Sequence, residues 1–557
     1  MAMTRETEMH FANIPDITIS RSKMVRPHQE WTSFNSSDLI PIYTDTDIMP
    51  GDTVKMKMSS VIRMMTPLVP VMDNCYADIT FFFVPHRLVW DHWENFWGQN
   101  DTEPWANRVD YVPPTIKAPE TTGWVEKSLA DYFGYPLHAP EKVVSAFPIK
   151  AYIKIWNDFW RDQNWKNPAH LDTGDGTTIG MNPSDFDGEG LPDWDYASYG
   201  ETAAKPFKVA KLHDYFTSVL PSTQKGPEVY LPLGSEAPVV TKNDPDMMPS
   251  GATFPINAEG AQIAVRVNSS STNIIYSDDT SQSGLSAFTS GQAGALFADL
   301  SQAVGATITQ LRQAYSIQRF YEALARGGSR YIETIRSIFG ITNPDYRLQR
   351  AEYVGGFRMP INISQVVQSD AGASDATPLG HTGAMSMTID QHEDLFTHTF
   401  TEHGTLMGLI TVRHDMSYSQ GCPRMYSRFK LFDYYTPQLA NISEQPVLNQ
   451  EIYCDGSATD SEAWGYQEAW AEYRYFPNQV HSELRSTYGQ SLDVWTFQDY
   501  YTERPTMGDK WIDADEEAIK RTLAVQNHDQ FFANFYFKPT YIRPMPLYSI
   551  PGLSGHF

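Results

Sequence analysis

The segment ADITFFFVP, residues 77–85, decides the fold class of this chain. It is apolar on nearly both faces, which is typical of a strand buried on two sides. Residues 54–59 alternate apolar and polar side chains after the turn-forming Pro50-Gly51-Asp52, and the distant segment QFFANFYFKP at 530–539 repeats this alternation. Because these segments lie hundreds of residues apart, we expect one mainly β core interrupted by large insertions.

Helical periodicity appears inside the predicted insertions. From Pro148, a residue suited to the first turn of a helix, apolar side chains recur at helical spacing as far as Trp160. A second such pattern begins near Thr307 and stops at Gly327-Gly328. The sequence therefore predicts a helix in each of two insertions.

The composition excludes several classes of protein. The 557 residues carry a formal net charge of -25, and 41% of them are hydrophobic. Phosphate binding needs clustered positive charge, so a dedicated single-stranded-DNA-binding protein is disfavoured. The three cysteines are widely spaced, which indicates neither a disulfide framework nor a cysteine zinc site. The first residues lack the pattern of a signal peptide, and every apolar run is far shorter than the roughly 20 residues of a membrane span.

Residues 226–305 differ in composition from the rest of the chain. Between 226 and 300, eight acidic residues accompany two basic ones, and Ser, Gly, Asn and Thr dominate. The apolar run Ile263–Val267 and the pair Ile274-Ile275 are too short to bury a core alone. We expect an exposed excursion that folds loosely or through partners.

Motifs of catalysis are absent from the sequence. It contains no P-loop, no GxSxG and no HExxH. His398, Glu402 and His403 resemble a metal cluster, but the strand-like alternation of HTFTEHG places His403 on the opposite face from the other two. The acidic loops DTGDG (172–176) and DFDGEG (185–190) are interpreted as solvated loops, with a weakly bound divalent cation as the alternative. We expect no catalytic residue, no cofactor and no dedicated metal site.

Basic residues gather in a few islands. Arg21, Lys23 and Arg26 lie in a polar segment that is either a flexible arm or a DNA-facing contact. A second set comprises Arg312, Arg319, Arg326, Arg424 and Arg428. The first three are spaced by seven, so they share one face of a helix. Such arginines can follow phosphates in the interior or pair with acids of a neighbouring subunit, and the acidic total favours the subunit contact.

The segment EAWAEYRYFP, residues 468–477, interleaves aromatic side chains with a single arginine. Aromatic rings of this kind can stack on bases of single-stranded nucleic acid. The same pattern is typical of a packed core or an interface, which is the interpretation we favour.

Eight ordered blocks carry a family resemblance. They are LIPIYTDTDIMPGDT (39–53), TPLVPVMDNCYADITFFFVPHRLVWDHWENFWG (66–98), FPIKAYIKIWNDFWRDQN (147–164), LHDYFTSVLPSTQKGPEVYLPLG (212–234), ATITQLRQAYSIQRFYEALARGGSRYIETIRSIFG (306–340), FTEHGTLMGLITVRHDMSYSQG (400–421), EYRYFPNQVHSELRSTYGQSLDVW (472–495) and RPMPLYSIPGL (543–553). With these blocks the chain closely resembles the major capsid proteins of the Microviridae, particularly the gokushovirus branch of small tailless single-stranded-DNA bacteriophages.

The resemblance implies a fold and an assembly. The fold would be a single eight-stranded jelly-roll β-barrel with large loop insertions containing helices. Sixty copies would form a T=1 icosahedral shell around a circular single-stranded DNA genome. The implied division is an N-terminal interior arm at 1–30, a first core part with a helical insertion at 31–225, an exposed insertion at 226–305 that forms a threefold protrusion, and a second core part with insertions at 306–557.

The resemblance also implies partners and a location. Besides copies of itself, the chain would meet the genome, minor or pilot proteins, internal scaffolding proteins and DNA-binding virion proteins, and it would contact a host receptor through 226–305. It would be part of the virion, assembled in the cytoplasm of a bacterial host, and would be no enzyme. The alternative is a soluble carbohydrate-binding or carbohydrate-active jelly-roll protein, which the tryptophan content and acidity allow.

Overall fold

Strand β5 (Cys75–Pro85), predicted from residues 77–85, lies inside a four-stranded antiparallel sheet. The order of this sheet is β13 (Glu352–Ile361), β5, β17 (Gly404–His414) and β3 (Ile40–Ile48). At Gly408 there is no room for a side chain, because a Cβ atom there would lie only 2.7 Å from a carbon of the Phe81 ring. The glycine therefore allows the Phe81 ring to pack closely against β17.

The computed structural model describes residues 20–99, 110–119, 123–169, 171–174, 205–229, 308–328, 330–362 and 387–548, and the short strands at 239–241, 253–258, 261–267, 274–277, 296–298, 365–367 and 382–385. The chain divides into two compact units. One is Gln224–Ala323, and the other combines Met1–Thr223 with Leu324–Phe557.

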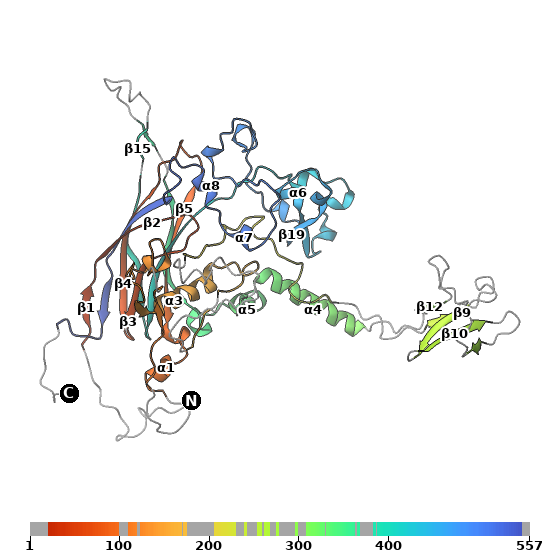
Figure 1. The fold of residues 1–557 in the computed structure, drawn as a ribbon, viewed down its shortest axis with the longest axis horizontal. Helices are drawn as coiled ribbons and strands as arrows, with labels where there is room; N and C mark the ends of the chain where they lie inside the picture. Colours follow the sequence, from red (N-terminus) through yellow and green to blue (C-terminus); the bar gives the residue numbers. More distant parts are fainter. Residues whose placement is uncertain are drawn as a thin grey trace, which may run out of the picture. The chain divides into compact units, whose positions relative to one another are not determined.

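A second antiparallel sheet joins both ends of the chain. Its path is β1 (Ser22–Val25), β21 (Thr540–Arg543), β4 (Thr53–Met64), β20 (Phe531–Phe537) and β2 (His28–Phe34), with β16 (Thr388–Thr399) also paired to β4. Burial alternates regularly along β4, because successive side chains point to opposite faces of the sheet, and its methionines lie on the inward face. Strands from the first and last parts of the sequence thus lie side by side (Figure 1).

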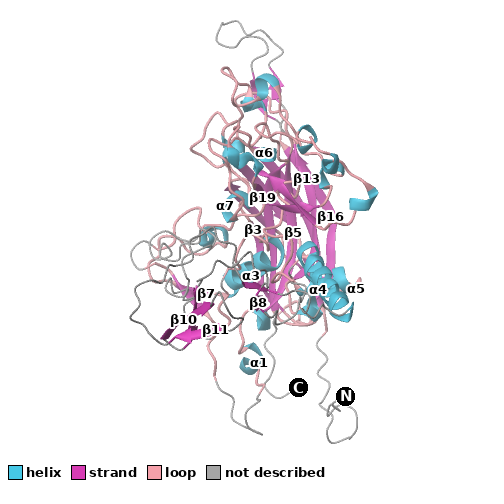
Figure 2. Ribbon diagram, turned by 90° about the vertical axis from the view of Figure 1, so that its right-hand side faces the viewer, coloured by secondary structure: helices cyan, strands magenta, loops and turns pink. Residues whose placement is uncertain are grey.

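The main core lies between the two sheets. Phe81 from the four-stranded sheet and Phe537 from the six-stranded sheet meet with ring centres 6.3 Å apart. Both belong to one buried apolar cluster that draws on strands of both sheets. The prediction of a mainly β core interrupted by insertions containing helices is therefore confirmed (Figure 2).

A second apolar cluster covers the other face of β5. Helix α3 (Phe147–Ile155), extended by a π-helical turn at Trp156–Trp160, packs here, and Phe82 contacts Phe159 with ring centres 4.7 Å apart. The predicted helix starting at Pro148 is confirmed, because this proline lies in its first turn. β5 is buried on two sides, as its apolar pattern predicts.

Further elements surround the two sheets. A third cluster contains Phe216, Trp464 and Trp511. This cluster lies beside the antiparallel pair of β18 (Glu444–Leu448) and β19 (Ala463–Glu468). The remaining short elements of this unit are α1 (Trp93–Phe96), β6 (Thr115–Lys117), α2 (Leu129–Tyr132), β7 (Val143–Ser145), α5 (Tyr331–Phe339), β14 (Gln365–Val367), β15 (Thr382–Met385), α6 (Asn449–Ile452), α7 (Asp509–Ile512) and α8 (Glu517–Lys520).

The unit Gln224–Ala323 has sheets of its own. They are a three-stranded sheet of β9 (Thr253–Ala258), β10 (Ala261–Val267) and β11 (Ile274–Ser277), and a pair of β8 (Val239–Thr241) and β12 (Leu296–Ala298). Helix α4 (Ile308–Gly327) begins in this unit and ends at the predicted glycine pair. Gly328 has a φ of +93°, a conformation that favours glycine and stops the helix.

Candidate functional surfaces

The N-terminal basic cluster lies at the edge of the six-stranded sheet. β1 and β2 occupy much of residues 20–34, so this part of the expected arm is built into the sheet. Nη2 of Arg21 donates to the Thr53 hydroxyl at 3.4 Å, and Lys23 is exposed. Nη1 of Arg26 forms a 2.9 Å ion pair with the buried Asp45. Two of the three cations therefore face solvent with no ion pair among the residues that the structure describes, whereas Arg26 has a structural partner.

Asp45 belongs to a buried polar cluster that ties the C-terminal strand to the core. The hydroxyl of Tyr541 donates to Asp45 at 2.5 Å and lies 2.6 Å from the hydroxyl of Tyr43. Burial, reinforced by the charge of Asp45, raises the pKa of Tyr43 to about 12. Nε of Arg543 donates to Asp52 at 3.0 Å. Strands β3 and β21 are thus joined by hydrogen bonds shielded from water.

The three arginines spaced by seven lie on α4. Arg312 and Arg319 are exposed, whereas Nε of Arg326 donates to the buried carboxylate of Glu444. Helix α4 also leaves Ile308 and Tyr315 exposed. The choice between subunit contact and genome contact stays a prediction for Arg312 and Arg319, while Arg326 already has an acidic partner in its own chain.

Arg424 and Arg428 are also paired within the chain. Nη1 of Arg424 lies 3.7 Å from Oε1 of Glu451. Nη2 of Arg428 donates to Oε1 of Glu472 at 3.0 Å, and its guanidinium lies 4.3 Å from the centre of the Tyr473 ring. Both positive charges are therefore largely neutralised locally.

A cavity of about 600 Å³ opens beside these two arginines. Its wall includes Tyr473, Tyr475 and Phe476 from the predicted aromatic segment 468–477, all with exposed rings. Trp470 of the same segment is buried. The segment is thus partly core and partly surface, and the surface part forms a ready contact for another molecule.

The three residues that resemble a metal cluster separate in the structure. The prediction of one continuous strand through residues 398–404 is wrong. β16 ends at Thr399, and the chain turns before β17 begins at Gly404. His398 lies 3.7 Å from Glu352, Glu402 accepts hydrogen bonds from Arg87, and the His403 ring stacks on Trp97. Among the described residues, no three His, Cys, Asp or Glu side chains gather as a metal site. Residues 175–204, with the second acidic loop, lie outside the described residues.

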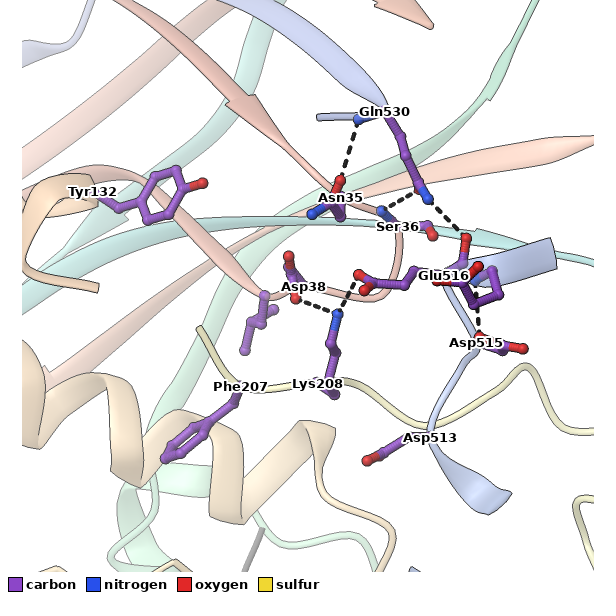
Figure 3. A network of polar contacts seen from close by, with 12 residues as sticks. Asn35, Ser36, Asp38, Tyr132, Phe207, Lys208, Asp513, Asp515, Glu516 and Gln530 are labelled. Carbon is purple, nitrogen blue, oxygen red and sulfur yellow. Dashed lines mark hydrogen bonds and ion pairs between the residues drawn. The ribbon is translucent and has the colours of Figure 1, made fainter. Parts of the chain in front are cut away.

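Sequence reasoning missed a network of partly buried ions that joins distant segments. Nζ of Lys208 lies 2.8 Å from Asp38 and 3.0 Å from Glu516 (Figure 3). The side chain of Gln530 accepts from the backbone N–H of Ser36 and donates to the carbonyl oxygen of Glu516. Burial raises the pKa of Asp38 to about 6, and the charge of Lys208 opposes this rise. No local motif signals such a network, because its members come from four separated segments.

Comparison with known proteins gives the decisive observation. The model of a family described as "Capsid protein (F protein)" matches residues 12–553. The chain belongs to this capsid protein family.

The capsid protein has relatives of nearly equal length. It is 36% identical to capsid protein VP1 of Bdellovibrio phage phiMH2K, over 100% of this chain and 99% of that one. It is 38% identical to capsid protein VP1 of Spiroplasma virus 4, over 96% of each chain. It is 33% identical to capsid protein VP1 of Chlamydia phage 1, over 98% of this chain and 97% of that one.

The family assigns the protein's general role. The capsid protein is a structural protein of a phage virion and not an enzyme, and the resemblance to Microviridae capsid proteins is confirmed. The alternative of a carbohydrate-binding or carbohydrate-active protein is not favoured. In the described part of the chain, every helix is too short or too polar to cross a membrane.

Proposed function

We propose that this capsid protein is the major subunit of a T=1 icosahedral shell, in which sixty copies enclose a circular single-stranded DNA genome. The observation that carries the proposal is the end-to-end match with capsid proteins VP1 of three phages. A second support is the burial of β5 between two apolar clusters, which gives the subunit a rigid centre.

We further infer that the eight long strands form a jelly roll. Leaving aside the short strands β1 and β21, one sheet runs β2-β20-β4-β16 and the other β3-β17-β5-β13. In each sheet, strands from early and late parts of the chain alternate, as two Greek keys wound together require. The short strands extend the first sheet on one side of β4.

The genome contact belongs to the same proposal. Arg21 and Lys23 are supported as DNA-facing residues by their exposure and by the lack of an ion pair within the described chain. Packaged strands of any sequence must be accommodated, so the contact uses phosphate charge and stacking rather than base recognition. The region 226–305 is proposed as a threefold surface protrusion that contacts a host receptor, while minor, scaffolding and DNA-binding proteins complete the particle. We propose no cofactor.

Electron cryo-microscopy of particles from cells that express the chain tests the shell. We expect closed shells with icosahedral symmetry and sixty identical subunits. A chain that stays monomeric under every assembly condition, alone and with the other virion proteins, would overturn the proposal.

A further inference from the structure

One apolar surface is left uncovered by the residues that the structure describes. It consists of the exposed apolar side chains of residues 425–435 together with the rings of Tyr473, Tyr475 and Phe476, and we call it the aromatic surface. Phe429 is 85% exposed and Phe432 is 72% exposed. An aromatic side chain buries about 150–250 Å² when it is covered. These two rings alone therefore approach the few hundred Å² of the largest patch on a typical monomer.

The aromatic surface is held in a fixed shape. The Asp433 carboxylate accepts hydrogen bonds from the backbone N–H groups of Phe429 and Lys430, at 2.9 and 2.7 Å, and these bonds lower the pKa of Asp433. Arg428 connects the two halves, because it pairs with Glu472 and stacks on Tyr473. A surface whose backbone is ordered before binding loses little entropy when a partner covers it.

The charges beside this surface disfavour the genome as its cover. A phosphate backbone needs cations whose charge is free to attract it. The carboxylates of Glu451 and Glu472 already accompany Arg424 and Arg428 at the cavity wall. Of the other cations here, Lys430 lies beside Asp433, so Arg485 is the one arginine of the cavity wall without an ion pair in the described part of the chain. Stacking of bases would remain, with weak electrostatic attraction.

The charge of the whole chain points to where copies can touch. With a formal net charge of -25, two copies repel each other at long range. A contact at a surface that is locally apolar and carries little net charge avoids this repulsion. The aromatic surface has these properties, and its aromatic and arginine content is typical of the core of protein interfaces.

We infer that the aromatic surface is covered by a second copy of this chain in the assembled shell. The inference rests on the proposed function, because it needs neighbouring copies. It assigns to residues 425–435 and to Tyr473, Tyr475 and Phe476 the role of a subunit contact, with the adjacent cavity receiving side chains of the neighbour.

Oxidative footprinting of dissociated subunits, DNA-free shells and DNA-filled shells tests the inference. We expect the oxidation rates of Phe429, Phe432 and Tyr475 to fall several-fold on assembly, and to the same extent in both kinds of shell. Protection only in filled shells would show that the genome covers the surface and would overturn the inference. Rings that stay fully reactive in both shells would overturn it as well.

A double variant tests the same contact by assembly. Phe429→Ser with Phe432→Ser removes two exposed rings and should leave a folded subunit with an unchanged unfolding temperature that no longer forms shells. Tyr548→Ser, which removes another ring that is 77% exposed, is the matched control and should still assemble. Normal shells from the double variant would overturn the inference alone. Failure of the wild-type chain to form any shell would overturn the proposed function, and the inference with it.

Discussion

Lys211 and Asp499, which are 288 residues apart in the sequence, form a buried ion pair with Nζ and Oδ2 2.8 Å apart. Both side chains are only 3% exposed. Burial raises the pKa of Asp499, but the charge and hydrogen bond of Lys211 outweigh this effect and leave it below its usual value. Tyr501 also donates to this carboxylate, at 2.7 Å. This ion pair connects the segment around Lys211, which follows helix α3 in the sequence, to the C-terminal part of the chain around Asp499.

Removing one partner of this pair should destabilise the subunit strongly. Asp499→Ala leaves the Lys211 ammonium buried without its counter-charge, so we expect a loss of about 3–5 kcal/mol in the free energy of unfolding at neutral pH. The double variant Lys211→Met with Asp499→Leu removes both charges and should recover most of the loss. Urea unfolding of the three proteins measures this, and an Asp499→Ala variant as stable as the wild type would refute the prediction.

Acid should destabilise the subunit through His414. Burial lowers the pKa of His414 to about 4, and neither ring nitrogen has a hydrogen-bond partner among the described residues. An unfolded histidine titrates near pH 6.5. Between those two values His414 binds more protons in the unfolded chain than in the folded one, so its contribution to stability falls as pH falls, by about 2 kcal/mol between pH 7.5 and 5.

The variant His414→Leu checks this pH dependence. Relative to the wild type, it should lose about 2 kcal/mol less stability between pH 7.5 and 5, because the other buried groups titrate alike in both proteins. These groups include His86, whose pKa burial lowers to about 4, and Glu30 and Asp38, whose pKa burial raises to about 7 and about 6. His213→Leu, at an exposed position, is the control and should keep the wild-type pH dependence. Equal pH dependence in His414→Leu and wild type would show that His414 has no part in it.

Substitutions of the N-terminal basic residues should have two different effects, one on DNA retention and one on subunit stability. Arg21→Gln with Lys23→Gln should lower DNA retention in particles and reduce the slope of log affinity against log salt by about 1.4, because two phosphate contacts with a single strand are lost. Arg26→Gln should instead destabilise the subunit, since it leaves Asp45 without its ion pair. Retention measured across ionic strengths, with unfolding measured in parallel, separates the two. Unchanged packaging by the first variant at every salt concentration would exclude this contact.

The insertion should be dispensable for the shell. β8 and β12 pair antiparallel, with Thr241 opposite Leu296, so the chain enters and leaves the segment between them at adjacent positions. Replacing 242–295 with a short Gly/Ser linker should preserve assembly, because closure entropy changes by only about 0.6 kcal/mol per doubling of loop length. Host attachment should be lost. If particles of this variant adsorb to cells at the wild-type rate, the proposed role of the insertion in host attachment is wrong.

The sequence predicted the buried strands better than the polar ones. β5 and β20 are recognisable because their apolar patterns reflect burial directly. β2, with the sequence HQEWTSF, lies at a sheet edge and only its last residue is buried, so it carries little apolar signal. The turn at residues 400–403 was missed because local alternation continues through it.

The candidate surfaces were predicted less completely than the fold. Arginine spacing correctly placed Arg312, Arg319 and Arg326 on one helix, but it could not show that Arg326 pairs with Glu444. Similarly, nothing near Lys211 indicates Asp499 as its partner. Long-range pairing depends on the folded arrangement of the insertions, which no local pattern records.

The position of β20 and β21 makes folding depend on the end of translation. β4 leaves the ribosome early, yet one of its edges is covered by strands at the far end of the chain. At bacterial elongation rates of about 5–20 residues per second, that edge waits on the order of tens of seconds for its partners. A truncated or stalled chain lacks the hydrogen bonds that complete the sheet, and we expect proteases to remove it. We therefore expect that only chains in which these strands have been made enter the growing particle.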